Sequence, residues 1–410
     1  MTKNNIKTKE NKMNTHKNIL LAMFINLAFI AHAFSASFPL TLTDDDGVKV
    51  TITKEPQKIA IAGIWPLPSV MIMLDNSAKR IAYMPQASKN ALLYSFMIDF
   101  YPQIAQIPTG NSENIEELLN YKPDVFICHS ANKAICALMR KSGVPTLAIS
   151  VAKWGYNSHK TLEGWFRLIA PLLDKESKAK QILQEIKKQE ELAQKAQQSY
   201  TQNLSVQNTH AQNPQNPSTT NAKNSSAHRA HAQKESTALP KAIFIHTYAS
   251  DEKLVIAGIF GKYLLDFSGG IHALDSLRSA TTSIEEIYKL NPDIIYINNF
   301  TPLLPKQILE SKRWQGIKAV QHKRVYKLPL GSYRPFAPGV DLPILLAWLR
   351  AHNAEFIESS NTHLDSTKGA IKEDYKAYAK QYYKEIFGLD LNNAQIDKIF
   401  NPSSKAGHLD

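Results

Sequence analysis

Residues 114–127 read NIEELLNYKPDVFI, and residues 283–297 read SIEEIYKLNPDIIYI. The two stretches align without a gap, Ile-Glu-Glu on Ile-Glu-Glu and Pro-Asp on Pro-Asp. In each, an N-cap residue type (Asn114 or Ser283) stands three residues before a glutamate, as in a capping box that opens a short helix. The proline ends that helix, and the apolar run after it predicts a strand buried on both faces. The repeat predicts two similar α/β lobes. Chance similarity of two helix–strand units is the alternative.

Apolar strands and helical segments alternate on both sides of this repeat. Besides a β-hairpin around the Asp-Gly turn of residues 41–52, the expected strands are 58–63, 81–84, 125–128, 146–150, 241–246, 294–297 and 324–328. Such alternation is typical of doubly wound lobes with parallel sheets. Residues 175–198 contain neither Gly nor Pro and follow an apolar helical stripe. This favours one long helix that joins the two lobes, with a ligand cleft between them.

The chain divides by composition into six parts. Residues 200–239 are rich in Asn, Gln, Ser, Thr and Ala, which predicts a disordered insertion because too little apolar surface can be buried. The expected parts are a signal peptide (1–33), an N-terminal lobe (34–160), a linker-helix region (161–199), the insertion (200–239), a C-terminal lobe (240–350) and a helical tail (351–410).

The first 33 residues have the pattern of an export signal. A lysine-rich region leads into an apolar run over 19–30 and then Ala31-His32-Ala33, an A-x-A cleavage pattern. The run is short for a membrane span, and Met13 is an alternative start. The formal net charge is +12, but no basic run is interleaved with aromatic residues, so we expect no nucleic-acid partner. The export signal predicts a periplasmic protein.

The chain has two cysteines, Cys128 and Cys136. The first ends a predicted strand and the second lies in the helix that follows. An oxidising compartment permits a disulfide, but only geometry can decide it. Two buried thiols are the favoured expectation, with the disulfide as the alternative.

Ligands of open α/β sheets bind beyond the carboxyl ends of the strands. The polar and aromatic residues expected at those ends are Trp65, Met84, Thr109, His129, Trp154, Tyr156, His246, Tyr248, Asn298, Tyr333 and Arg334. Arg334, placed in an exposed loop, can clamp a carboxylate, a phosphate or an anionic chelate. His129 and His246 are candidate metal ligands from opposite walls. The alternatives are structural histidines and aromatic residues of the core.

Taken together, these motifs resemble a known family. The pieces that carry the resemblance are the 41–52 hairpin, Pro108-Thr109-Gly110 before the first repeat, Lys122-Pro123-Asp124-Val125, Gly269-Gly270, Ile284-Glu285-Glu286 and Asn291-Pro292-Asp293-Ile294. The chain resembles the periplasmic substrate-binding proteins of ABC importers for ferric siderophores, haem and cobalamin. The resemblance covers roughly residues 38–199 and 240–350.

The resemblance implies capture of a ligand without reaction, and delivery to an inner-membrane permease and its ATPase by a monomer without a cofactor. Glu116 and Glu285 are the symmetry-matched candidates for pairing with permease arginines. Their alternative role is to favour the helix N-terminus. A ferric siderophore is the leading ligand, with a nickel chelate, cobalamin, haem or molybdate as alternatives. A periplasmic enzyme, such as a lyase or a metal-dependent hydrolase, is the rival class.

Overall fold

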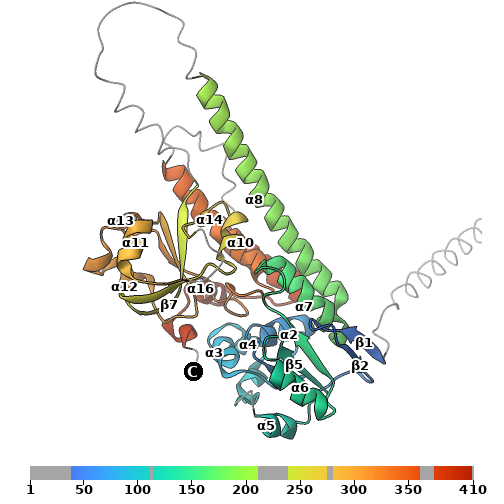
Figure 1. Ribbon diagram of the computed structural model, residues 1–410. Helices are drawn as coiled ribbons and strands as arrows, with labels where there is room; N and C mark the ends of the chain where they lie inside the picture. Colours follow the sequence, from blue (N-terminus) through green and yellow to red (C-terminus); the bar gives the residue numbers. More distant parts are fainter. Residues whose placement is uncertain (1–37, 111–113, 211–238, 275–279, 361–373, 409–410) are drawn as a thin grey trace, which may run out of the picture.

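The computed structural model describes residues 38–110, 114–210, 239–274, 280–360 and 374–408. The residues form two α/β lobes with a long helix beside them (Figure 1). The expected signal peptide lies outside the described residues. Among those described, no helix is both long and apolar enough to cross a membrane.

The N-terminal lobe is a four-stranded parallel sheet of order β4-β3-β5-β6. The expected hairpin, β1 (Leu40–Thr43) with β2 (Lys49–Ile52), precedes it. The sheet strands are β3 (Ile59–Ala62), β4 (Ile81–Tyr83), β5 (Val125–His129) and β6 (Thr146–Ile149). The helical segments of this lobe are α2 (Leu67–Asp75), α3 (Gln86–Tyr94), α4 (Met97–Phe100), η1 (Pro102–Gln106), α5 (Ile115–Asn120) and α6 (Lys133–Lys141).

The Pro-Asp repeat performs the same task in both lobes. The carboxylate of Asp124 accepts hydrogen bonds from the backbone N–H groups of Gln57 and Lys58, both at 2.9 Å. In the other lobe, Asp293 accepts one from the N–H of Lys241 at 3.0 Å. Each aspartate thus fixes the strand that follows it against the start of the neighbouring strand. The capping differs, because Asn114 caps its helix whereas Ser283 makes no side-chain cap, which corrects the second half of that expectation.

The C-terminal lobe has a mixed sheet of order β10-β8-β7-β11-β12, with β9 paired to β7. Its central pairs are parallel, as expected, and β8 and β10 add antiparallel pairs on one side, which makes the sheet mixed. The reason is that β7 continues past the expected end at 246 to Ser250 and returns directly as β8. The elements are β7 (Lys241–Ser250), β8 (Lys253–Ile256), α10 (Gly261–Asp266), β9 (Ile271–His272), β10 (Ala280–Thr282), α11 (Ile284–Leu290), β11 (Ile294–Ile297), α12 (Pro305–Leu309), η2 (Lys312–Trp314), α13 (Lys318–Gln321) and β12 (Val325–Lys327).

Two helices connect the lobes. α7 (Ser158–Leu173) ends at Asp174 in the left-handed conformation, and α8 (Glu176–His210) follows as the long linker. Disorder was expected from residue 200, but the helix continues to His210, because no Gly or Pro occurs before Pro214. The rest of the expected insertion, residues 211–238, lies outside the described residues.

The C-terminal part returns toward the N-terminal lobe. α14 (Leu342–Ser360) packs along α8, where the guanidinium of Arg350 donates a 2.6 Å hydrogen bond to the Gln189 side chain. This helix spans the expected boundary between residues 350 and 351. The remaining elements are α15 (Tyr375–Phe387), α16 (Asn393–Phe400) and η3 (Ser404–Gly407).

Candidate functional site

Aromatic side chains from the two lobes face each other beyond the strand ends. Trp65 follows β3, and Phe300 follows β11 in the opposite lobe. Their ring centroids lie 6.0 Å apart. Trp65 keeps 39% of its surface exposed, so its ring is accessible to a ligand. A hydrogen bond from the Ser88 hydroxyl to the Trp65 carbonyl, 2.7 Å long, fixes this loop to α3. The pair is an aromatic contact between the lobes that lies beyond the strand ends.

His246 lies behind Phe300 in the C-terminal lobe. Its ring centroid is 5.2 Å from that of Phe300 and 5.9 Å from that of Phe336. The Nδ1 atom is 2.9 Å from the amide nitrogen of Asn298, whose buried Oδ1 has no partner among the described residues. Burial lowers the pKa of His246 to about 4, so the imidazole is neutral at physiological pH. A neutral imidazole is the form that binds metal ions.

His129 ends β5 in the N-terminal lobe. Its Nδ1 atom accepts a hydrogen bond from the Ala131 N–H at 2.9 Å, and burial lowers its pKa. Gly63 stands close by, because a Cβ on this glycine would lie 3.2 Å from the His129 Cβ. Among the described residues, no three His, Cys, Asp or Glu side chains converge on one point. Metal binding by His129 and His246 therefore stays a prediction.

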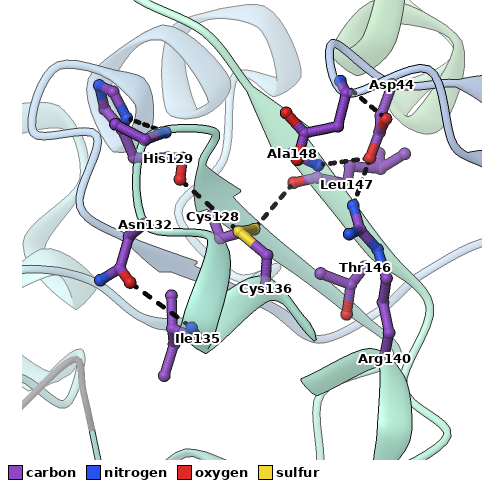
Figure 2. Close-up of a disulfide and its surroundings, with 12 residues drawn as sticks. Asp44, Cys128, His129, Asn132, Ile135, Cys136, Arg140, Thr146, Leu147 and Ala148 are labelled. Atoms are coloured by element: carbon purple, nitrogen blue, oxygen red, sulfur yellow. Dashed lines mark hydrogen bonds and ion pairs between the residues drawn. A yellow bond between two sulfur atoms is a disulfide. The ribbon is translucent and has the colours of Figure 1, made fainter. Parts of the chain in front are cut away.

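The two cysteines form a disulfide, which corrects the expectation of free thiols. The bond joins Cys128 of β5 to Cys136 of α6, and their Cα atoms are 5.8 Å apart (Figure 2). This separation lies within the range that disulfides require. Because Cys128 directly precedes His129, the bond also fixes the end of β5, where His129 lies.

Arg334 is fully buried, so the expectation of an exposed loop is wrong. Its Nε atom donates to the Ala406 carbonyl at 2.9 Å, and its terminal nitrogens donate to the carbonyls of Ala87 and His408, both at 3.1 Å. The guanidinium carbon also lies 4.9 Å from the centroid of the Phe300 ring. Arg334 thus joins the N-terminal lobe, the C-terminal lobe and the end of the chain.

The other expected contact residues fall into two groups. Trp154, Tyr156 and Tyr248 are partly buried, and Tyr156 meets Phe260 of the opposite lobe edge-on at 5.5 Å. Tyr248 donates a hydrogen bond to Asp251 at 2.8 Å. Burial, together with this hydrogen bond, raises the pKa of Tyr248 to about 12.

Three further expected residues are buried or already bonded to a neighbouring side chain. Thr109 donates a hydrogen bond to Gln86 at 2.5 Å. Met84 is fully buried in the N-terminal core, and Tyr333 is buried with its hydroxyl 3.2 Å from Arg334. A ligand role for these residues stays a prediction. Met84 could reach a ligand only after a local rearrangement.

Glu116 and Glu285 both lie on the surface, each in the first turn of its helix. Glu285 makes an ion pair with Arg313 at 3.5 Å. The two glutamates occupy equivalent positions in the two lobes, and their docking to a permease stays a prediction.

Sequence reasoning missed Phe300, Phe336 and the end of the chain. Phe300 could have been found by the rule that selected Trp65, since it follows a buried strand closely. Residues 406 and 408 gave no signal, because they bind Arg334 only through backbone carbonyls. The arrangement brings the rings of Trp65 and Phe300, one from each lobe, into contact with each other, and it leaves the Trp65 ring partly exposed to solvent.

Comparison with known proteins agrees with this architecture. A family model described as periplasmic binding protein matches residues 77–214 and 221–330. A search of curated protein sequences finds no match.

Solved structures are similar over most of the chain. A periplasmic solute-binding protein of Veillonella parvula has 24% identity and a TM-score of 0.63, over 89% of this chain and 98% of its own. The molybdate-binding protein MolA of Haemophilus influenzae, bound to molybdate, has 16% identity and a TM-score of 0.60, over 86% and 99%. CeuE of Helicobacter pylori, in a complex with nickel and histidine, has 18% identity and a TM-score of 0.57, over 88% and 99%. The chain belongs to the periplasmic binding protein family of ABC importers.

Proposed function

We propose that this protein captures an anionic ferric chelate of the siderophore class between its lobes. It then delivers the chelate to an ABC permease and its ATPase at the inner membrane. The observation that carries the proposal is the pair Trp65 and Phe300, which brings one aromatic ring from each lobe to the same place, with Arg334 against the back of Phe300.

The chemistry of a ferric chelate suits these groups. The catecholate arms of a siderophore offer aromatic faces to Trp65 and Phe300, and aromatic pairs contribute beyond their buried area. A guanidinium binds anionic oxygens with two parallel hydrogen bonds. Arg334 would make such bonds after exchanging backbone carbonyls for ligand oxygens.

A nickel chelate is the second candidate. It is favoured by His246, which is neutral and lies against Phe300, within the aromatic group that the ligand would contact. The nickel and histidine bound by CeuE make such a ligand plausible for this fold. Cobalamin, haem and molybdate remain alternatives within the same class.

The binding role implies that the ligand is returned unchanged and that the protein acts without a cofactor. An enzyme with this architecture would convert the ligand. The mature chain, after export by residues 1–33, would work as a monomer in the periplasm. Glu116 and Glu285 would meet the permease, one from each lobe.

The test is a titration of the mature protein followed by tryptophan fluorescence. The ligands are a ferric tris-catecholate, the same chelator without iron, nickel with histidine, haemin, cobalamin and molybdate. Saturation at one equivalent by the ferric complex, with recovery of the intact chelate, supports the proposal. If only one of the other ligands binds, the proposed ligand is wrong and that ligand takes its place. If any of the compounds is steadily converted, the proposed binding function is wrong and the protein is an enzyme.

A further inference from the structure

The last twenty residues of the described chain contact both lobes. From α16, the Gln395 amide donates to Asp99 and the Lys398 ammonium donates to the Ser95 carbonyl, both at 3.0 Å. Both acceptors belong to the N-terminal lobe. From the same helix, the Ile399 carbonyl accepts a 2.8 Å hydrogen bond from the Leu330 N–H of the C-terminal lobe. The tail therefore forms a second connection between the lobes, in addition to α8.

The final turn, η3, contacts the residue that follows Phe300. The carbonyls of Ala406 and His408 are the ones that accept from Arg334. Between them in the chain, Gly407 packs against the backbone of Thr301, the residue after Phe300. A Cβ on Gly407 would lie 2.2 Å from the Thr301 carbonyl carbon, so only glycine permits this approach.

The turn η3 also contacts the N-terminal lobe. The turn η3 packs against α3 of the N-terminal lobe, on the side of the molecule away from α8 (Figure 1). Lys405 faces the same helix α3, with its ammonium 5.9 Å from the centroid of the half-exposed Tyr94 ring. The tail lies wholly outside the segments that match the family model, which end at residue 330.

We propose that residues 404–408 are a latch that holds the two lobes together when no ligand is bound. The latch occupies the guanidinium of Arg334 with two backbone carbonyls, and an anionic chelate must displace it to reach that group. The competition for Arg334 rests on the function proposed above, whereas the closing of the lobes does not.

The closing of the lobes is tested without any ligand. Spin labels on genetically encoded unnatural amino acids replace Lys133 and Lys306, exposed residues of α6 and α12, and electron paramagnetic resonance measures the distance between them. Gly407→Ala lifts the latch in the full-length chain, and a chain ending at Ser403 removes it. Gly339→Ala is the matched control, because its Cβ would have only an ordinary contact, 3.8 Å from the Ala337 carbonyl oxygen.

We expect a longer or broader distance distribution in both latch variants and an unchanged one in Gly339→Ala. If both latch variants keep the distribution of the unaltered chain, the latch is refuted. The chain ending at Ser403 keeps the test decisive should Gly407→Ala fail to fold.

The competition is then tested with the ferric tris-catecholate complex as the probe. Removing a competitor for Arg334 should tighten binding of the probe at least about tenfold, which corresponds to about 1.4 kcal/mol. Unchanged or weaker binding by open latch variants refutes the competition. If no form of the protein binds the probe, the proposed ligand is wrong, but the distances still decide whether the latch exists.

Discussion

The disulfide between Cys128 and Cys136 leads to a quantitative prediction about stability. Replacing both cysteines by alanine removes a cross-link between residues that are 8 positions apart. In the chain-entropy model a closed loop of this length contributes about 2.5 kcal/mol to the free energy of unfolding. The site is fully buried, so loss of the two sulfur atoms adds a small packing cost in the same direction.

The assay is equilibrium unfolding in urea under oxidising conditions, followed by far-UV circular dichroism. The two single variants, Cys128→Ala and Cys136→Ala, provide the sharpest control. Each of them breaks the same cross-link, so each should lose nearly as much stability as the double variant. Adding a reductant should lower the stability of the unaltered chain and leave the double variant unchanged. Single effects that sum to the double effect, or a loss below about 1 kcal/mol, would refute the reasoning.

Three further predictions concern the site and its docking surface. Phe300→Ala should weaken binding of the captured ligand about tenfold or more, measured by fluorescence titration, whereas Phe300→Trp should keep it. Reversing the charges of Glu116 and Glu285 together should abolish uptake in cells and leave ligand affinity in solution intact; normal uptake would reject their docking role. His246, whose pKa is lowered from 6.5 to about 4, takes up its proton in the unfolded chain first. Stability should therefore fall between about pH 6.5 and 4, by up to about 3 kcal/mol, and His246→Gln should flatten that part of the profile; an equally steep profile would contradict the burial of this group.

Local pattern was sufficient for most elements of the fold. Pro123-Asp124 and Pro292-Asp293 mark the junction between helix and buried strand, as predicted, because the proline and the apolar run act over a few residues. The antiparallel strands at one side of the C-terminal sheet are the part that the pattern does not predict. The chain reverses direction after β7 and returns as β8, so the two strands form a hairpin. The four residues of β8, 253–256, are too short a run to be told from a loop by sequence.

The candidate site was harder to predict, because its geometry depends on distant residues. Arg334 looked exposed next to Pro335, yet the carbonyls that cover it belong to residues 72 and 74 positions later. The cysteine pair posed the same difficulty on a smaller scale, since only the Cα separation could decide between thiols and a disulfide. Backbone acceptors leave no trace in side-chain chemistry, so a pattern of residue types cannot reveal them.

The tail also has a consequence for how the chain reaches its final form. Its hydrogen bonds to the N-terminal lobe join residues 296 and 303 positions apart, from Asp99 to Gln395 and from Ser95 to Lys398. Contacts of such high sequence separation are costly to close and form slowly. Each lobe can collapse around its own sheet first, and the lobes acquire their mutual orientation only when the last residues dock. Refolding should therefore show a late phase in which secondary structure is already complete, and shortening the chain at its end should remove that phase without slowing the earlier ones.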